Sequence, residues 1–200
     1  MHPEFSIIMP SFLGDYRGAA KDRVNKFERA VDSVIDQLFE DWELIVVADG
    51  CDETVRQCLS IYGQVNKVGC FRIPKADQWC PSVRNAGLTM AKGRWMIYLD
   101  TDDYWGPEHL QMVYGRVSRA TSSQWAWFDA LVPRKEHWIP MQADITKCAK
   151  HGTANIVHRP GYLWPTQQKH RATGGLDYGT QDCAFTEVLK KLPGGEYLGL

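Results

Sequence analysis

Apolar residues in the first half of the chain form short continuous runs, and stretches with helical periodicity separate these runs. Continuous apolar runs are typical of strands that are buried on both faces of a parallel sheet. Between them, apolar residues recur at the three- and four-residue spacing of an amphipathic helix. The expected strands cover residues 5–10, 42–48, 68–74 and 94–99, and the expected helices cover residues 24–39, 53–62, 82–91 and 107–118.

This alternation predicts an α/β fold with a single Rossmann-like, mostly parallel central sheet flanked by helices. The second half is less regular, with expected strands at residues 124–132 and 153–159 among proline-rich loops. A last helix is expected over residues 180–192, where a Pro-Gly-Gly segment follows. No linker composition divides the chain, so residues 1–200 are expected to form one domain.

Composition and charge argue against several classes of protein. The 200 residues carry a formal net charge of -1, which gives no overall attraction to nucleic acid or to an anionic membrane. No apolar stretch approaches the roughly 20 residues of a membrane-spanning helix, and the first residues lack the pattern of a signal peptide. We therefore expect a cytoplasmic protein without a transmembrane segment. The six cysteines contain no CxxC pair, so we expect reduced thiols and no zinc site.

Acidic side chains gather where the expected strands end. Asp49 ends the second strand, and Asp100, Asp102 and Asp103 follow the fourth. The carboxyl ends of parallel strands meet at one edge of a sheet, where ligands of such proteins bind. One aspartate there is common in a turn or a helix cap, but neighbouring carboxylates repel by about 1 kcal/mol per pair at ~4 Å in water. Three together favour Mg²⁺ or Mn²⁺, which prefers oxygen ligands and leaves positions open for phosphate oxygens.

Glycine-rich phosphate-binding motifs are absent. The sequence contains no GxxxxGK[ST] segment and no GxGxxG segment after a strand. P-loop hydrolases and Rossmann dinucleotide-binding proteins are therefore disfavoured. A nucleotide that is held through a shared metal ion is the interpretation that the residues alone favour.

Four segments of the chain, taken in order, match the pattern of a known family. The segments are FSIIMPSF (5–12), RAVDSVIDQLFEDWELIVVADGCDET (29–54), SVRNAGLTMAKGRWMIYLDTDD (82–103) and GGLDYGTQD (174–182). They resemble, in family 2 glycosyltransferases of the GT-A fold, the first strand, the Asp-Asp-Gly-Ser block, the Arg-Asn-x-Gly helix with the Asp-x-Asp motif, and the segment that carries the catalytic base. The resemblance covers most of the chain, and it implies a nucleotide-sugar-binding half over about residues 1–107 and an acceptor-binding half over about residues 108–200.

The resemblance implies a role for each matched residue. Asp49 would bind the nucleobase, Asp182 would be the catalytic base, and the metal ion would bind Asp102, Asp103 or both. Ala48 and Gln181 depart from the family pattern, because each stands where the family usually has an acidic residue. The implied nucleotide-sugar-binding residues are Pro10, Ser11, Phe12, Asp49, Arg84, Asp100, Thr101 and Asp102.

The chemistry implied by the family is the inverting transfer of a sugar from a UDP- or GDP-sugar to an acceptor hydroxyl, with Mn²⁺ or Mg²⁺ as the cofactor. The Gln-x-x-Arg-Trp motif of processive synthases is absent, which favours the transfer of a single sugar. The sequence does not identify the acceptor.

Two alternatives stay open. A sugar-phosphate nucleotidyltransferase would carry a glycine-rich basic segment after its first strand, and residues 11–23 are a poor version of it. A non-catalytic sugar-nucleotide-binding module would not need the retained Asp182. Several aromatic residues also have two interpretations, since Trp79, Trp105 and Trp164 could stack on sugar rings or pack in the core, and His158 or His170 could bind metal or form ordinary hydrogen bonds.

Overall fold

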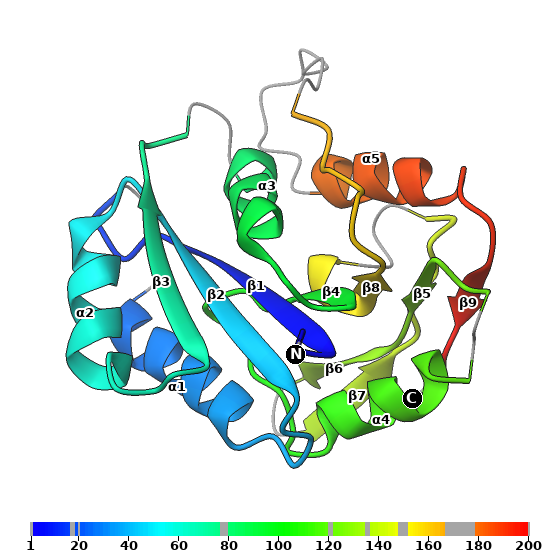
Figure 1. Ribbon diagram of the computed structural model, residues 1–200, viewed down its shortest axis with the longest axis horizontal. Coiled ribbons are helices and arrows are strands. Elements are labelled where there is room, and N and C mark those ends of the chain that lie inside the picture. The colour runs from blue at the N-terminus through cyan, green and yellow to red at the C-terminus, as the bar shows by residue number, and fades with distance from the viewer. Residues whose placement is uncertain are drawn as a thin grey trace.

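In the part of the chain that the structure describes, seven strands form one central sheet and two further strands form a separate hairpin (Figure 1). The computed structural model describes residues 2–16, 19, 21–76, 80–119, 122–134, 137–147, 152–166 and 179–199. The strands are β1 (Phe5–Ser11), β2 (Trp42–Asp49), β3 (Val68–Ile73), β4 (Trp95–Tyr98), β5 (Trp125–Trp127), β6 (Ala130–Arg134), β7 (His137–Met141), β8 (Ile156–His158) and β9 (Gly195–Tyr197). The helical elements are α1 (Arg23–Ile35), α2 (Asp52–Tyr62), α3 (Pro81–Met90), α4 (His109–Val117), α5 (Gly179–Leu189) and the 3₁₀ turn η2 (Thr153–Asn155).

The strand order places a binding edge at the centre of the sheet. The order is β3-β2-β1-β4-β8-β5-β9, and β1 pairs in parallel with both β2 and β4. The direction in which strands are added therefore reverses between β1 and β4, and ligands of such sheets bind beyond the carboxyl ends at this reversal. β8 runs antiparallel to both β4 and β5. The predicted mostly parallel α/β sheet is confirmed.

Alternate residues of the central strands enter two separate cores. Ile7 of β1 and Val46 of β2 pack with α1, α2 and α4, whereas Ile8 and Val47 pack with α3 and α5. Figure 1 shows α3 and α5 on one face of the sheet, and α1 and α4 on the other. The continuous apolar runs of the sequence reflect this burial on both faces.

The first helix is shorter than the sequence pattern predicted. It ends at Ile35, and Leu38, which the pattern assigned to the buried face, is 62% exposed. Gln37 explains the difference, because its side-chain amide donates to the carbonyl oxygen of Gly106 and its side-chain oxygen accepts from the Leu110 N–H. These bonds fasten the end of α1 to the start of α4, and the backbone leaves the helix.

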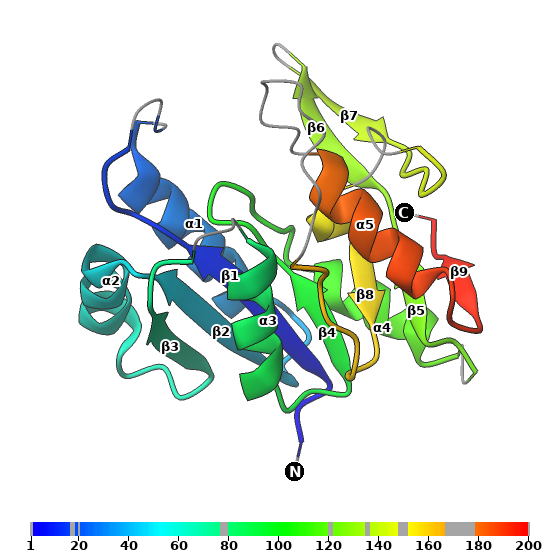
Figure 2. The same ribbon diagram turned by 90° about the horizontal axis from the view of Figure 1, so that it is seen from above.

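The second half differs more from the prediction. Residues 124–132, expected as one strand, form β5 and the start of β6, and the β6–β7 hairpin stands apart from the main sheet (Figure 2). Prolines within this hairpin, at Pro133 and Pro140, hide its strand pattern because proline is rare inside strands. Residues 153–159, also expected as a strand, begin with η2, and the exposed strand β9 was not predicted. No helix within the described residues is long and apolar enough to cross a membrane.

A chain of buried hydrogen bonds joins β4, β8 and the loop that follows β8. The His158 Nδ1–H donates to the Arg159 carbonyl at 2.7 Å, so the other ring nitrogen, Nε2, accepts from the Tyr98 hydroxyl at 2.6 Å. The Trp164 Nε1–H donates to the same hydroxyl at 2.9 Å. Each polar atom of this chain has a partner, as buried polar groups require.

We predict that Tyr98→Phe lowers the free energy of unfolding by about 2–4 kcal/mol, because it leaves Trp164 Nε1–H and His158 Nε2 buried without partners. Tyr197→Phe is the control, since its hydroxyl bonds Asp129 at an exposed position and its loss should cost about 0.5 kcal/mol or less. Urea denaturation of both variants measures the difference. Equal losses would contradict the proposed importance of the buried chain.

We also predict that the protein loses stability as the pH falls from about 6.5 to 4. Burial lowers the pKa of His158 to about 4, although its bond to the Arg159 carbonyl acts in the opposite direction. The unfolded chain therefore binds more protons than the folded protein within this range, and stability falls by up to ~1.4 kcal/mol per pH unit for such a group. NMR titration should show a neutral His158 ring at pH 5, and a charged ring at that pH would contradict the prediction.

Candidate active site at the carboxyl edge of the sheet

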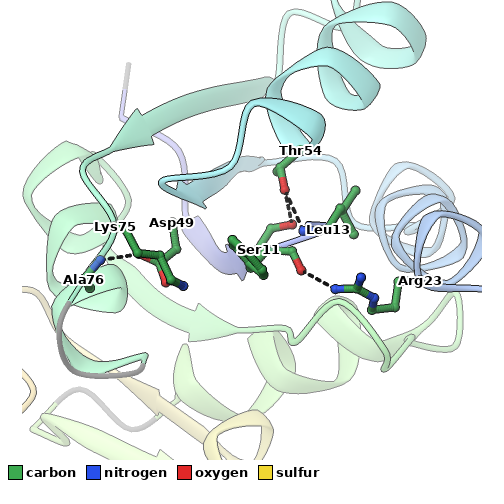
Figure 3. Close-up of polar contacts among 8 residues, drawn as sticks. Ser11, Leu13, Arg23, Asp49, Thr54, Lys75 and Ala76 are labelled. Carbon is green, nitrogen blue, oxygen red and sulfur yellow. Dashed lines mark hydrogen bonds and ion pairs between the residues drawn. The ribbon is translucent and has the colours of Figure 1, made fainter. Parts of the chain in front are cut away.

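The loop that follows β1 is held in place by polar contacts from two helices (Figure 3). Thr54 of α2 shares a 3.2 Å hydrogen bond with the Ser11 hydroxyl and accepts another, also of 3.2 Å, from the Leu13 N–H. Arg23 of α1 donates to the Phe12 carbonyl at 3.1 Å. The backbone of this loop is therefore fixed, and the ring of Phe12 remains half-buried at the edge.

Asp49, at the end of β2, is buried and has two partners of its own. Its Oδ1 accepts from the Ala76 N–H at 2.7 Å, and its Oδ2 forms an ion pair with Lys75. The Lys75 ammonium also lies 4.1 Å from the centre of the Phe12 ring. Figure 3 shows Asp49 facing Lys75 and Ala76 across the ends of β2 and β3. In the sequence, the position of Lys75 after a weak expected strand is the one feature that points to it.

Arg84, on α3, lies buried beneath the acidic motif. Its Nη2 donates to Asp100 Oδ1 at 3.2 Å, and its guanidinium lies 4.6 Å from the centre of the Trp164 ring. Burial alone would lower the pKa of Arg84, but the charges of Asp100 and other neighbours raise it above the usual value, so the group stays charged. Its Nε has no hydrogen-bond partner among the described residues.

The acidic motif turns sharply after β4. The Asp103 N–H donates to the Asp100 carbonyl at 3.1 Å, and Arg29 of α1 donates to the Asp102 carbonyl at 2.8 Å. Asp102 and Asp103 are exposed. Desolvation of the carboxyl group, followed by the charges of Asp100 and Asp102, raises the pKa of Asp103 to about 6, and Arg29 opposes this rise. The motif thus carries negative charge that nearby cations only partly balance.

Asp182, in the first turn of α5, comes from the far half of the chain. The Thr153 hydroxyl of η2 donates to Asp182 Oδ1 at 2.6 Å, and η2 precedes β8, which pairs with β4. The pKa of the Cys80 thiol, just before α3, depends on three of the candidate carboxylates. Burial raises its pKa, Arg84 lowers it, and the charges of Asp100, Asp182 and Asp49 raise it further. Asp49, Asp100 and Asp182 are therefore all near enough to Cys80, the residue before α3, to act on its thiol electrostatically.

Several residues with two sequence interpretations have packing roles. Trp164 is almost fully buried and stacks on Phe185 with ring centres 4.0 Å apart, and Trp105 stacks on His109 at 4.5 Å. His158 belongs to the buried hydrogen-bond chain, so its predicted alternative as a metal ligand is not supported. Trp79, His170 and residues 171–178, including the whole GGLD segment, lie outside the described residues.

The expectation of reduced thiols is partly wrong. Cys183 is disulfide-bonded, whereas Cys51, Cys58, Cys70 and Cys80 are free. Sequence spacing without a CxxC pair gave no indication of this bond. Cys183 directly follows Asp182, the candidate base, in α5.

The acidic motif suits a cation that draws its other ligands from a phosphorylated partner. Among the described residues, no group of three or more His, Cys, Asp and Glu side chains could hold a metal ion by itself. Asp100 is already paired with Arg84, which leaves Asp102 and Asp103 as oxygen donors. Mg²⁺ usually binds to one or two protein carboxylates, and its other coordination positions stay open for substrate phosphates.

One family model matches most of the chain. The model of the family described as "Glycosyl transferase family 2" matches residues 6–184. Bacillus subtilis TuaG, provisionally named as a glycosyltransferase of teichuronic acid biosynthesis, is 30% identical over 109 residues, which are 54% of this chain and 40% of that protein. The chain thus spans about two fifths of that relative's length.

Two solved structures share the fold. S. aureus TarS in complex with UDP-GlcNAc matches with a TM-score of 0.71 at 15% identity, over 97% of this chain and 55% of that one. The mannosyltransferase PcManGT from Pyrobaculum calidifontis, in complex with GDP-Man and Mn²⁺, matches with a TM-score of 0.53 at 11% identity, over 80% of this chain and 45% of that one. The expected GT-A fold is confirmed, and because the family model matches most of its length, the chain belongs to glycosyl transferase family 2.

Proposed function

We propose that the protein transfers a single sugar from a nucleotide-diphospho-sugar to an acceptor hydroxyl, with inversion at the anomeric carbon and with a divalent cation. One observation carries the proposal: Asp100 pairs with the buried Arg84 of α3 at 3.2 Å, and Asp49, Asp100 and Asp182 all act electrostatically on the Cys80 thiol just before α3, in a chain of this family. They come from β2, the segment after β4, and α5, which are far apart in the sequence. A structural role alone would not require three carboxylates from such distant segments to share one edge.

The donor nucleotide would lie across the ends of β1, β2 and β4. The ring of Phe12 offers a stacking surface for the base, and the buried Asp49 offers an acceptor for a base N–H. Asp100 and Thr101 would contact the ribose and diphosphate, beside the charged Arg84. The ligands named for the two solved structures, UDP-GlcNAc and GDP-Man, support a nucleotide-sugar donor.

The metal ion would be Mn²⁺ or Mg²⁺, held by Asp102 and Asp103. Both side chains are exposed, and neither forms an ion pair among those that the structure describes. The PcManGT complex contains Mn²⁺, which supports the same choice here. When bound, the cation would neutralise charge that develops on the nucleoside-diphosphate leaving group.

Asp182 would act as the general base. The acceptor oxygen attacks the anomeric carbon and the bond to the diphosphate breaks, while a carboxylate oxygen of Asp182 takes the hydroxyl proton. The Thr153 hydroxyl orients this carboxylate through its 2.6 Å hydrogen bond. Because η2 and α5 belong to the second half of the chain, the acceptor would bind on that side of the edge, opposite the donor residues.

We predict that Asp182→Asn keeps the nucleotide bound but lowers the rate of transfer about 10²–10⁴-fold, since the amide cannot take the proton. The change preserves the shape of the side chain and its bond from Thr153. Release of nucleoside diphosphate from UDP- and GDP-sugars, with and without added acceptors, measures the rate, and calorimetry with UDP or GDP measures binding.

Glu187→Gln is the matched control, because it makes the same carboxylate-to-amide change on the exposed side of α5. It should leave the rate unchanged. Full activity of the Asp182→Asn variant would contradict the assignment of Asp182 as the general base. Formation of pyrophosphate from a nucleoside triphosphate and a sugar phosphate would indicate a nucleotidyltransferase instead.

We predict that Asp102→Asn and Asp103→Asn each weaken Mn²⁺ binding about tenfold or more in the presence of UDP, because each removes a charged oxygen ligand. The EPR signal of free Mn²⁺ reports binding without any need for turnover. Asp52→Asn is the control, since its exposed carboxylate pairs with Arg72 at the same end of the sheet. Unchanged Mn²⁺ binding in both motif variants would show that the motif does not hold the metal ion.

A further inference from the structure

Two free thiols meet where α2 packs against β3. Cys58 of α2 is 2% exposed, and Cys70 of β3, the strand at one end of the sheet, is half-buried. Both cysteines are free. Figure 1 shows α2 beside β3, and Figure 2 shows the same arrangement from above. The Cys58 thiol donates a hydrogen bond to the Cys70 sulfur, so the two sulfur atoms are in contact.

The directions of the two elements explain why these thiols meet. β2 and β3 are parallel, and α2 connects the end of β2 to the start of β3, so α2 runs antiparallel to β3. Asp52, at the start of α2, pairs with Arg72, near the end of β3, at 2.6 Å. From this pair, Cys58 lies about 9 Å further along the helix, and Cys70 lies about 7 Å back along the strand. The two thiols are therefore at nearly the same level of the packed elements.

Cys58 lies on the buried face of α2, between two residues that fasten this helix. Thr54, one turn earlier, holds the loop after β1 through two hydrogen bonds of 3.2 Å. Tyr62, one turn later, donates to Asp32 of α1 at 2.8 Å. Residues at this spacing share one face of a helix. A covalent bond at Cys58 would thus attach β3 to the helix that positions the loop after β1.

The hydrogen bond makes the two thiols chemically unequal. Accepting it from Cys58 lowers the pKa of Cys70, although burial acts in the opposite direction. The same bond, followed by burial, raises the pKa of Cys58. The thiolate is the nucleophile in thiol–disulfide exchange, so Cys70, which is also the more exposed of the two, is the better attacking group. A second thiol beside such a cysteine can complete a disulfide.

We propose that Cys58 and Cys70 are a redox-active pair, which a small disulfide compound oxidises to an intramolecular disulfide. The Cys70 thiolate attacks one sulfur of the compound, whose S–S bond breaks and releases a first thiolate. Cys58 then loses its proton and attacks the Cys70 sulfur, and a second small thiolate leaves. Each released thiolate takes up a proton, which balances the two protons that the cysteines lose. The protein thiols are thereby oxidised, and the small disulfide is reduced to two thiols.

The test exposes the folded protein to oxidised glutathione and identifies the products by intact mass and peptide mapping. In the wild-type protein, we expect the loss of two hydrogen atoms and a pair of peptides linked through Cys58 and Cys70. The Cys58→Ser variant keeps a hydroxyl donor beside Cys70 but lacks the second thiol, so it should stop at one glutathionyl group on Cys70. The Cys70→Ser variant should remain unmodified at the buried Cys58.

Cys51→Ser is the matched control. Cys51 directly precedes α2 and is also free, and although burial raises its pKa, hydrogen bonds with Thr54 and the nearby backbone lower it. The Cys51→Ser variant should form the disulfide between Cys58 and Cys70 as the wild-type protein does. In folded Cys58→Ser, Cys70 should react about tenfold or more faster than the buried Cys51. In urea, the two rates should become similar.

Each of three results would overturn the proposal. If the wild-type protein keeps both thiols, Cys58 and Cys70 are packing partners only. If Cys58→Ser forms the glutathione adduct but the wild-type protein forms no disulfide, Cys58 does not resolve the adduct. A glutathionyl group on Cys58 in the Cys70→Ser variant would reverse the assigned roles. Thermal unfolding confirms that each variant is folded, and none of these results bears on the proposed transfer reaction.

Discussion

The burial of the central strands on both faces is the constraint on which the site depends. Ile7 and Ile8 of β1 enter different cores, so neither face of this strand can carry polar side chains to solvent. Polar chemistry is thereby restricted to the strand ends. Because β1, β2 and β4 are parallel, their carboxyl ends meet at one edge, and ligands of such sheets bind beyond these ends where the strand order reverses, here between β1 and β4.

The charges at this edge are balanced unequally. Asp49 pairs with Lys75 and Asp100 pairs with Arg84, so the carboxylates on either side of the reversal each have a cation. Asp102 and Asp103 extend beyond these pairs, and desolvation, followed by repulsion from Asp100 and Asp102, raises the pKa of Asp103. The proposed cation would relieve this repulsion, while the paired Asp49 and Asp100 would contact the nucleoside part of the proposed donor.

Much of the donor side could be predicted from the sequence, because each residue follows a strand that an apolar run makes visible. Asp49 and Asp100 are of this kind. Lys75 and Thr153 could not be found in this way, since their partners lie 26 and 29 positions away and no local pattern links them. The one feature of the sequence that pointed to Lys75 was its position after β3, because β3 ends at the same edge of the sheet. The β6–β7 hairpin was missed because Pro133 and Pro140 contradict strand propensity.

The antiparallel direction of β8 has a consequence for how this enzyme family can diversify. A strand that runs against its neighbour begins, rather than ends, at the edge where the neighbour ends, so η2 and Thr153 reach the candidate base from the start of β8. The proposed donor-binding residues follow strands, whereas Thr153 precedes one. Insertions in the segment before β8 would therefore change the proposed acceptor side, while β1, β2 and β4 would keep their register. A new acceptor specificity could then evolve without a change in the proposed donor site.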